Sequence, residues 1–300
     1  MIEKKVESST DYELQVWKVI GVFAMVFVAV QLSVAFFGVG INFLMRQISA
    51  GENVRVFIGG TISRVGMIAA VILLCAPVIT KVFNANSREI LYPFKREGLR
   101  DLMVGLGISI LSMTLIFLLE LVLGWLKIEG IALSGLPLDA VFRAIWMALL
   151  VNLVAAIGEE VLFRGLLVTG LKKAWDAPGA LFISAVIFGA SHLLVTGAAQ
   201  TSLLIFIPLL ALPGVMLGWA YLRTGNLWLA TGIHFAWNFF QDSIFNLASR
   251  TSTDSLIGFE TNQIGPAWFM GTSYGIEVGL AGIITLAVVV LGIWIYTKEK

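Results

Sequence analysis

Charged residues are scarce in this chain of 300 residues. They make up 13% of the sequence, whereas a typical soluble domain contains about 25%. Apolar residues make up 58%, and the mean hydropathy is +0.92. A water-soluble fold of this length could not bury so many apolar side chains, so we expect most of the chain to lie in lipid.

Other absences limit the chemistry. The net charge of +1 gives no electrostatic basis for binding nucleic acid. The single cysteine, Cys75, lies in an apolar run, so it forms no intrachain disulfide and is poorly placed for thiol catalysis. No Gly-x-Ser-x-Gly motif is present to provide a serine nucleophile.

Long apolar segments recur along the whole chain. A helix that crosses about 30 Å of hydrocarbon needs about 20 apolar residues, and a membrane barrel would instead show alternating segments of about ten. The sequence therefore predicts an all-α, polytopic membrane helix bundle with about eight transmembrane helices. The predicted spans lie near 16–43, 57–82, 102–126, 141–170, 178–195, 202–222, 227–248 and 276–296.

The loops predict an orientation and a division of the chain. Lys and Arg are concentrated in the loops on the side of the two termini, which predicts that both termini are cytoplasmic. The first apolar segment is longer than the apolar part of a signal peptide, so we expect it to be retained, and a bacterial plasma membrane is the simplest location. We expect three parts: helices 1–3 at 1–139, a core of helices 4–7 at 140–248, and an extracytoplasmic loop with the last helix at 249–300.

Three of the predicted helices carry pairs of residues spaced by four that include at least one polar residue, and this spacing places each pair on one helix face. Ionisable residues inside a membrane cost at least about 2.5–3.5 kcal/mol each, so they are candidates for function. We expect these helices to converge near the middle of the membrane and to bring the two histidines of the chain close to the carboxylates. The pairs are Glu160–Arg164, Phe188–His192 and His234–Asn238, with Glu159 beside the first.

The Glu160–Arg164 pair has an alternative interpretation, and Glu120 is a separate case. Glu160 and Arg164 are also typical of a structural ion pair whose charges cancel. Glu120, near the outer end of the third predicted helix, is expected to reach the membrane interface rather than to take part in chemistry.

The polar residues fit two reaction schemes, which the residues alone leave open. A carboxylate and an imidazole can activate water, while a second imidazole and an amide stabilise the oxyanion. Alternatively, Glu159, His192 and His234 can hold zinc with one position open for water. The chain contains no His-Glu-x-x-His motif, the usual helical zinc signature.

These motifs resemble those of the CAAX-protease and bacteriocin-processing family (CPBP, or Abi) of intramembrane endopeptidases. That family has EExxxR, FxxxH and HxxxN on successive membrane helices. This chain matches them with Glu159-Glu160-Val161-Leu162-Phe163-Arg164, Phe188 to His192, and His234 to Asn238. The stretch GVMLGWAYLRTGNLWLATGIH also resembles the segment before the family's last motif, and the resemblance covers about 140–245.

The resemblance implies a role for each matched residue. Glu159 and His192 would activate water, and His234 and Asn238 would stabilise the oxyanion or help to hold a metal. Glu160 and Arg164 would shape the site and balance its charge. Because members of the family have been described both as glutamate-dependent and as metalloproteases, zinc is a candidate cofactor.

The function predicted from the sequence is an intramembrane endopeptidase that hydrolyses peptide bonds of membrane proteins or membrane-associated peptides. Its expected partners are such a substrate and the lipid bilayer, and no nucleic acid. The alternative is a non-catalytic membrane partner, a bacteriocin-immunity protein or scaffold of the same fold. A secondary transporter is a weaker alternative, because the sequence lacks the internal symmetry typical of that class.

Overall fold

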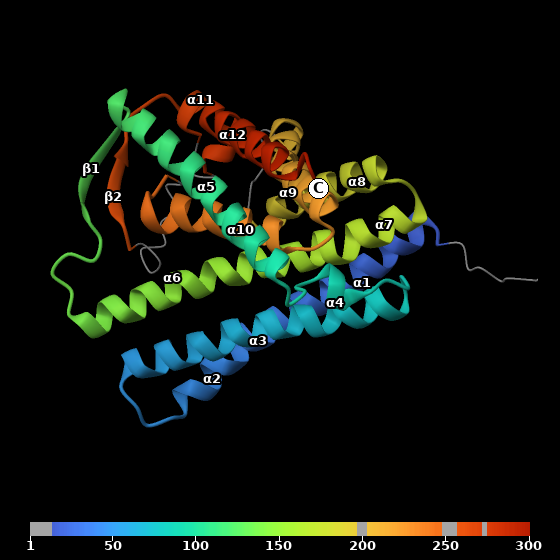
Figure 1. The fold of residues 1–300 in the computed structure, drawn as a ribbon. Helices are drawn as coiled ribbons and strands as arrows, with labels where there is room; N and C mark the ends of the chain where they lie inside the picture. Colours follow the sequence, from blue (N-terminus) through green and yellow to red (C-terminus); the bar gives the residue numbers. More distant parts are fainter. Residues whose placement is uncertain (1–13, 197–202, 248–256, 272–274) are drawn as a thin grey trace, which may run out of the picture.

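The computed structural model describes residues 14–196, 203–247, 257–271 and 275–300, and most of these are helical (Figure 1). Five helical stretches in these ranges are long and apolar enough to cross a membrane, which is compatible with a multi-pass membrane protein. They are α1–η1–α2 (α1 Val16–Ala35, η1 Phe36–Gly40, α2 Ile41–Arg46), α3 (Glu52–Lys81), α5 (Arg96–Val122), α6–η2–α7 (α6 Leu138–Glu159, η2 Glu160–Val168, α7 Thr169–Ala174) and α12 (Leu280–Thr297).

The other three predicted spans also coincide with helices. These are α8 (Ala177–Thr196), α9 (Leu203–Thr224) and α10 (Trp228–Asn238). A π-helix, η3 (Phe239–Ile244), continues α10 directly. The predicted helical segments are therefore found, and the number eight for the membrane crossings stays a prediction.

Close contacts between helices position α10 in the bundle. In sequence order α5 and α10 are far apart, but they pack against each other. A Cβ atom added to Gly105 of α5 would lie 2.5 Å from the carbonyl oxygen of Leu229, and one added to Gly232 of α10 would lie 2.5 Å from that of Leu102. The absence of side chains at both glycines lets the two backbones approach. This contact fixes the helix that carries His234.

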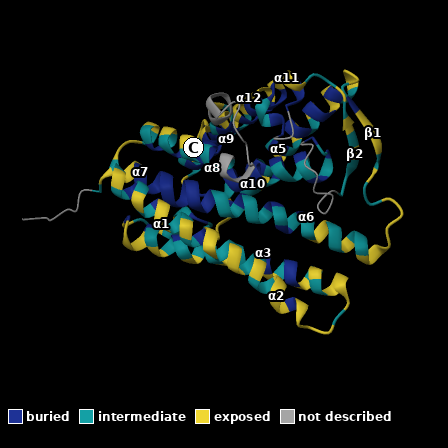
Figure 2. Ribbon diagram, turned by 180° about the vertical axis from the view of Figure 1, so that it is seen from behind, coloured by how far each residue is buried: buried dark blue, intermediate teal, exposed yellow. Residues whose placement is uncertain are grey.

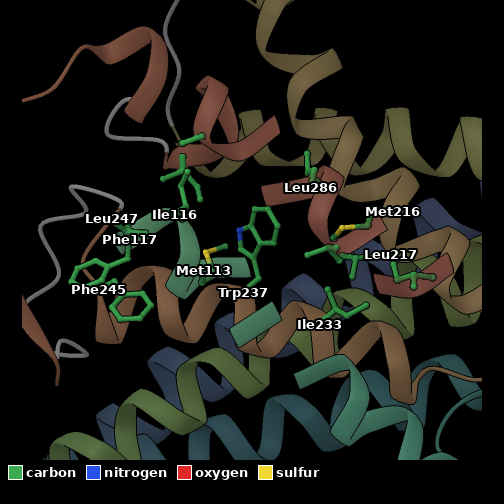
Figure 3. Packing of buried hydrophobic residues seen from close by; sticks show 14 of the residues in the cluster. Met113, Ile116, Phe117, Met216, Leu217, Ile233, Trp237, Phe245, Leu247 and Leu286 are labelled. Atoms are coloured by element: carbon green, nitrogen blue, oxygen red, sulfur yellow. The ribbon is translucent and has the colours of Figure 1, made fainter. Parts of the chain in front are cut away.

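Two apolar clusters form the core. One lies between α5, α9, α10 and α12 and contains Trp237, Met113 and Leu286, as Figure 3 shows. The other joins α1, α3 and η2 and contains Phe23, Val71 and Cys75. Outward-facing side chains of α1 and α3 are exposed and apolar, as expected for helices in contact with lipid (Figure 2).

The all-α prediction missed a small sheet. β1 (Leu126–Ile131) pairs antiparallel with β2 (Phe259–Gln263), and Leu126 lies opposite Gln263. The strands lie at the end of the bundle away from α7 and the C-terminus, as Figure 1 shows. Two short helices, α11 (Ala267–Met270) and η5 (Ile276–Val278), follow before α12.

At the opposite end, polar contacts join segments that the sequence predicts to share the cytoplasmic side. Lys173 Nζ donates to the carbonyl oxygen of Asn84 at 2.5 Å, near the short helix α4 (Ser87–Ile90). The buried carboxylate of Asp101 accepts from the Tyr296 hydroxyl at 2.6 Å and from Lys300 Nζ. The predicted cytoplasmic lysines of residues 1–13 and the predicted boundary at 248–249 lie outside the described residues.

The expectation for Glu120 is wrong. Its side chain is fully buried on α5, and neither carboxylate oxygen has a hydrogen-bond partner within the described residues. The position near a helix end indicates an interfacial side chain, but the fold encloses it. Helix–helix packing of this kind is not visible in a hydropathy pattern.

Candidate active site

The carboxylate pair lies where α6 changes into the π-helix η2. Glu159 is the last residue of α6, and Glu160 is the first of η2. Every residue of η2 is buried, and Figure 2 shows it as a dark blue segment within the bundle. A π-turn has i→i+5 hydrogen bonds, and π-turns occur often at functional sites. Glu160 and Arg164, four apart in η2, lie on one face and are hydrogen-bonded.

Glu160 is the centre of a buried hydrogen-bonded cluster. Its Oε1 atom accepts from Nη1 of Arg164 at 2.8 Å and from Nδ1 of His234 at 2.8 Å. Glu160 and Arg164 are almost completely buried, and His234 is 7% exposed. A buried carboxylate is stable when it is paired in this way, because its partners replace the lost hydration. The carboxylate therefore links η2 to α10.

His234 also faces the second carboxylate. Its Nε2 atom lies 3.7 Å from Oε2 of Glu159, which is too long for a direct hydrogen bond. Because Nδ1 is directed at Glu160, the imidazole is held with Nε2 toward Glu159. The Glu159 side chain is 32% exposed, and its Oε2 atom is buried without a hydrogen-bond partner among the described residues. Glu159 is thus the carboxylate of the pair that is available for chemistry.

Arg164 is enclosed by contacts from two further helices. Its Nη2 atom donates to the carbonyl oxygen of Gly214 on α9 at 3.1 Å. Its guanidinium lies over the ring of Phe188 on α8, 4.5 Å from the ring centre. A Cβ atom on Gly214 would lie 3.0 Å from the Cα atom of Ala185, so glycine allows α8 and α9 to approach here. The arginine therefore joins three helices around the glutamate.

Phe188 connects the two histidines. Its ring centre lies 4.7 Å from that of His192 and 6.4 Å from that of His234. Nδ1 of His192 donates a hydrogen bond to the Phe188 carbonyl oxygen, one turn earlier on α8, at 2.9 Å. His192 is half-buried, and so is Asn238, the last residue of α10, one turn beyond His234.

The structure brings the predicted residues together to different degrees. Glu159, Glu160, Arg164 and His234 form one contiguous set, as convergence of the helices predicts. His192 is adjacent to this set through Phe188. Asn238 is on the same helix as His234, but its amide makes no hydrogen bond to the described residues. The individual roles that the resemblance implies stay predictions.

Sequence reasoning missed a contact from the loop before α5. The hydroxyl of Tyr92 lies 3.0 Å from Oγ1 of Thr231, which precedes His234 by one turn. Burial raises the pKa of this tyrosine, so the hydroxyl stays neutral. Trp228 Nε1 donates to the Pro93 carbonyl oxygen at 3.0 Å and holds the same loop. Only the Tyr-Pro turn sequence could have indicated that this segment is ordered.

The three candidate zinc ligands do not form a metal site in this arrangement. No group of three or more His, Cys, Asp or Glu side chains in the described ranges is placed to hold a metal ion. His234 directs Nδ1 to Glu160, and the carboxylate that faces its Nε2 atom is too distant for a direct hydrogen bond. A zinc requirement stays a prediction.

Residues 141–240 match the model of a family described as Rce1-like, type II CAAX prenyl endopeptidase. The matched segment runs from α6 to the start of η3 and includes every predicted site residue. Comparison with curated proteins and with solved structures gives no match. The resemblance that the motifs indicate is thus confirmed, and from residue 141 to 240 the chain is similar to the Rce1-like type II CAAX prenyl endopeptidases.

Proposed function

We propose that this chain is an intramembrane endopeptidase that hydrolyses membrane proteins or membrane-associated peptides with water activated at Glu159. The observation that carries the proposal is the arrangement of Glu159 and His234. A carboxylate oxygen with no hydrogen-bond partner among the described residues lies 3.7 Å from an imidazole nitrogen whose ring is held by Glu160. The match to an endopeptidase family over the same helices supports it.

In the proposed reaction, Glu159 takes a proton from water as the oxygen attacks the carbonyl carbon of the scissile peptide bond. The carbonyl oxygen becomes an oxyanion, which accepts hydrogen bonds from an imidazole and from the Asn238 amide. The C–N bond then breaks, and Glu159 returns the proton to the leaving amine. The products are a carboxylic acid and an amine.

The two histidines divide the remaining roles. The resemblance implies that His192 assists Glu159 and that His234 stabilises the oxyanion. The geometry favours His234 as the neighbour of Glu159, because its Nε2 atom lies 3.7 Å from the carboxylate. Gln at either position keeps a polar side chain but cannot be protonated. The pH dependence of turnover should therefore change more in the Gln variant of the histidine that assists Glu159 than in the other.

The proposal includes a bundle of eight membrane crossings with both termini in the cytoplasm of a bacterium. The exposed residue Ser134, between β1 and α6, would then be extracytoplasmic, and the exposed Lys172 would be cytoplasmic. In a Cys75→Ala background, a membrane-impermeant thiol reagent should label Ser134→Cys in intact cells. It should label Lys172→Cys only after the cells are opened. The reverse pattern would contradict the orientation.

The activity is tested by comparing protein termini in cells that express wild type, Glu159→Gln or Glu120→Gln at equal levels. Glu120 is a matched control, since it is also a buried glutamate in a membrane helix but lies outside the site. New termini should be present with wild type and Glu120→Gln and absent with Glu159→Gln. Cleavage that persists in Glu159→Gln would refute the proposal and favour the binding-partner alternative.

A further inference from the structure

A partly open cavity lies apart from the candidate active site. It has a volume of about 830 Å³ and is lined by residues of η1, α2, α3 and α6. No residue of the Glu159–His234 set lines it. Its size is within the range of about 300–1,000 Å³ that is common for ligand sites. The cavity lies along the half of α3 and α6 that leads toward the β1–β2 end of the bundle.

The cavity contains an arginine that the active site does not use. Arg64 lies within α3, twelve residues after its first residue and thus about 18 Å along the helix. Its Nη1 atom donates to the Gly60 carbonyl oxygen at 3.2 Å, and it forms no ion pair with a described carboxylate. A cation inside a membrane helix is a candidate for function, and it calls for an anion.

The position of this guanidinium is built into the helix packing. A Cβ atom on Gly60 would lie 3.0 Å from Nη1 of Arg64 and 2.4 Å from Cε of Met147 on α6. Glycine therefore leaves room for the arginine to turn back along α3 into the cavity beside α6. The nearby Arg143 is neutralised by Asp139 at 2.5 Å. Glu52 also lines the cavity, but it is in the first turn of α3 and distant from Arg64 along the helix.

The remaining walls are partly polar and partly apolar. Val56, Met67, Val151 and Val154 line the same cavity, together with the polar residues Asn42, Asn53 and Ser63. A second groove, of about 300 Å³, lies between the same two helices and is lined by Thr61 and by apolar and aromatic side chains that include Trp146. Aromatic side chains of this kind are typical of the level where lipid headgroups meet the hydrocarbon. The cavity thus offers a cationic and polar region beside apolar wall residues.

We propose that this cavity binds an anionic phospholipid, with the phosphate at Arg64 and an acyl chain along the apolar walls of α3 and α6. The unpaired guanidinium supplies charge-assisted hydrogen bonds to phosphate oxygens. The surrounding bilayer supplies the ligand, so the lipid needs no route through water. The inference does not depend on the proposed proteolytic activity.

The test uses full-length protein in nanodiscs of phosphatidylcholine that contain a minor fraction of labelled phosphatidylglycerol. Wild type should retain phosphatidylglycerol after extraction into detergent, as measured by native mass spectrometry. Arg64→Gln should weaken retention about ten- to a hundredfold, the effect of losing a charge-assisted hydrogen bond. Arg55→Gln is the matched control, because Arg55 is on the same helix but does not line the cavity.

Two further variants separate lipid binding from folding. Ala144→Trp fills the cavity without changing its charge and should also reduce retention, whereas Arg64→Lys should keep most of it. Equal retention by wild type and Arg64→Gln, or equal loss in Arg55→Gln, would overturn the proposal. Displacement of the lipid by inorganic phosphate alone would show a simple anion site, and preference for labelled fatty acid over phosphatidylglycerol would show a carboxylate site. Either result would contradict phospholipid binding.

Discussion

Arg164 and Arg64 are both arginines inside predicted membrane helices, but their surroundings differ. Arg164 is 1% exposed and contacts a carboxylate, a carbonyl oxygen and an aromatic ring from three elements. Arg64 is half-buried and donates to a carbonyl oxygen of its own helix. In the first region the protein supplies every counter-group of the charge. In the second region the charge faces a cavity and pairs with no carboxylate among the described residues.

The largest effect is expected from breaking the buried pair. Arg164→Met leaves the Glu160 charge uncompensated and should lower the free energy of unfolding by about 3–5 kcal/mol. Adding Glu160→Met should recover much of that loss, because two apolar side chains replace the pair, while activity stays absent. Unfolding in mixed micelles measures both variants. A double variant no more stable than the single one would show that the charge of Glu160 is not what destabilises it.

Glu120 should respond in the opposite direction from Glu160. Its carboxylate is buried and has no hydrogen-bond partner among the described residues. Glu120→Met should therefore raise the free energy of unfolding by about 1–3 kcal/mol. Glu160→Met serves as the comparison and should be less stable than wild type in the same assay. A loss of stability in both variants would indicate that Glu120 has a stabilising partner.

Substitution of Phe188 should have a smaller effect on stability and should also disturb both histidines. Phe188→Leu removes the ring beneath the Arg164 guanidinium and should reduce stability by about 1–2 kcal/mol. Because the ring also contacts His192 and His234, the rate of substrate cleavage should fall as well. Phe182→Leu, on the exposed face of the same helix, is the control and should change neither quantity. Unaltered cleavage in Phe188→Leu would exclude a positioning role.

The smallest change in stability is expected at Arg64. Arg64 forms no ion pair with a carboxylate among the described residues. Arg64→Gln in detergent should therefore alter the free energy of unfolding by less than about 1 kcal/mol. In membranes with phosphatidylglycerol, wild type alone should gain stability from the bound lipid. Thermal unfolding in nanodiscs with and without this lipid makes the measurement. A large loss in detergent would place Arg64 with Arg164 as a structural residue.

The sequence predicted those features that depend on hydropathy and on spacing along one helix. The apolar segments coincide with helices, and residues spaced by four, such as Glu160 and Arg164, lie on one face. The spacing did not predict that Nε2 of His234 would lie 3.7 Å from Oε2 of Glu159. That result depends on how α10 is rotated, which is determined by its contact with α5 at Gly105 and Gly232.

Features that depend on contacts between distant segments were not predicted. The π-turn at Glu160 has no signature in composition, and the burial of Glu120 requires knowledge of which helices surround it. The cavity at Arg64 depends on Gly60, whose missing side chain is visible in the sequence but whose neighbour Met147 is not. Met147, which lies against Gly60, belongs to α6 rather than to α3.

The pairing of β1 with β2 has a consequence for the order of folding. Lys127 is synthesised long before its partner Asn262, because helices α6 to α10 lie between them in the sequence. Such a contact of high sequence separation forms late, because the intervening chain must first be ordered. The helices that carry the candidate site can therefore pack during synthesis while that end of the bundle is still open. The sheet forms only after β2 has been synthesised, and α12, which packs against α5 and α9, follows it in the chain.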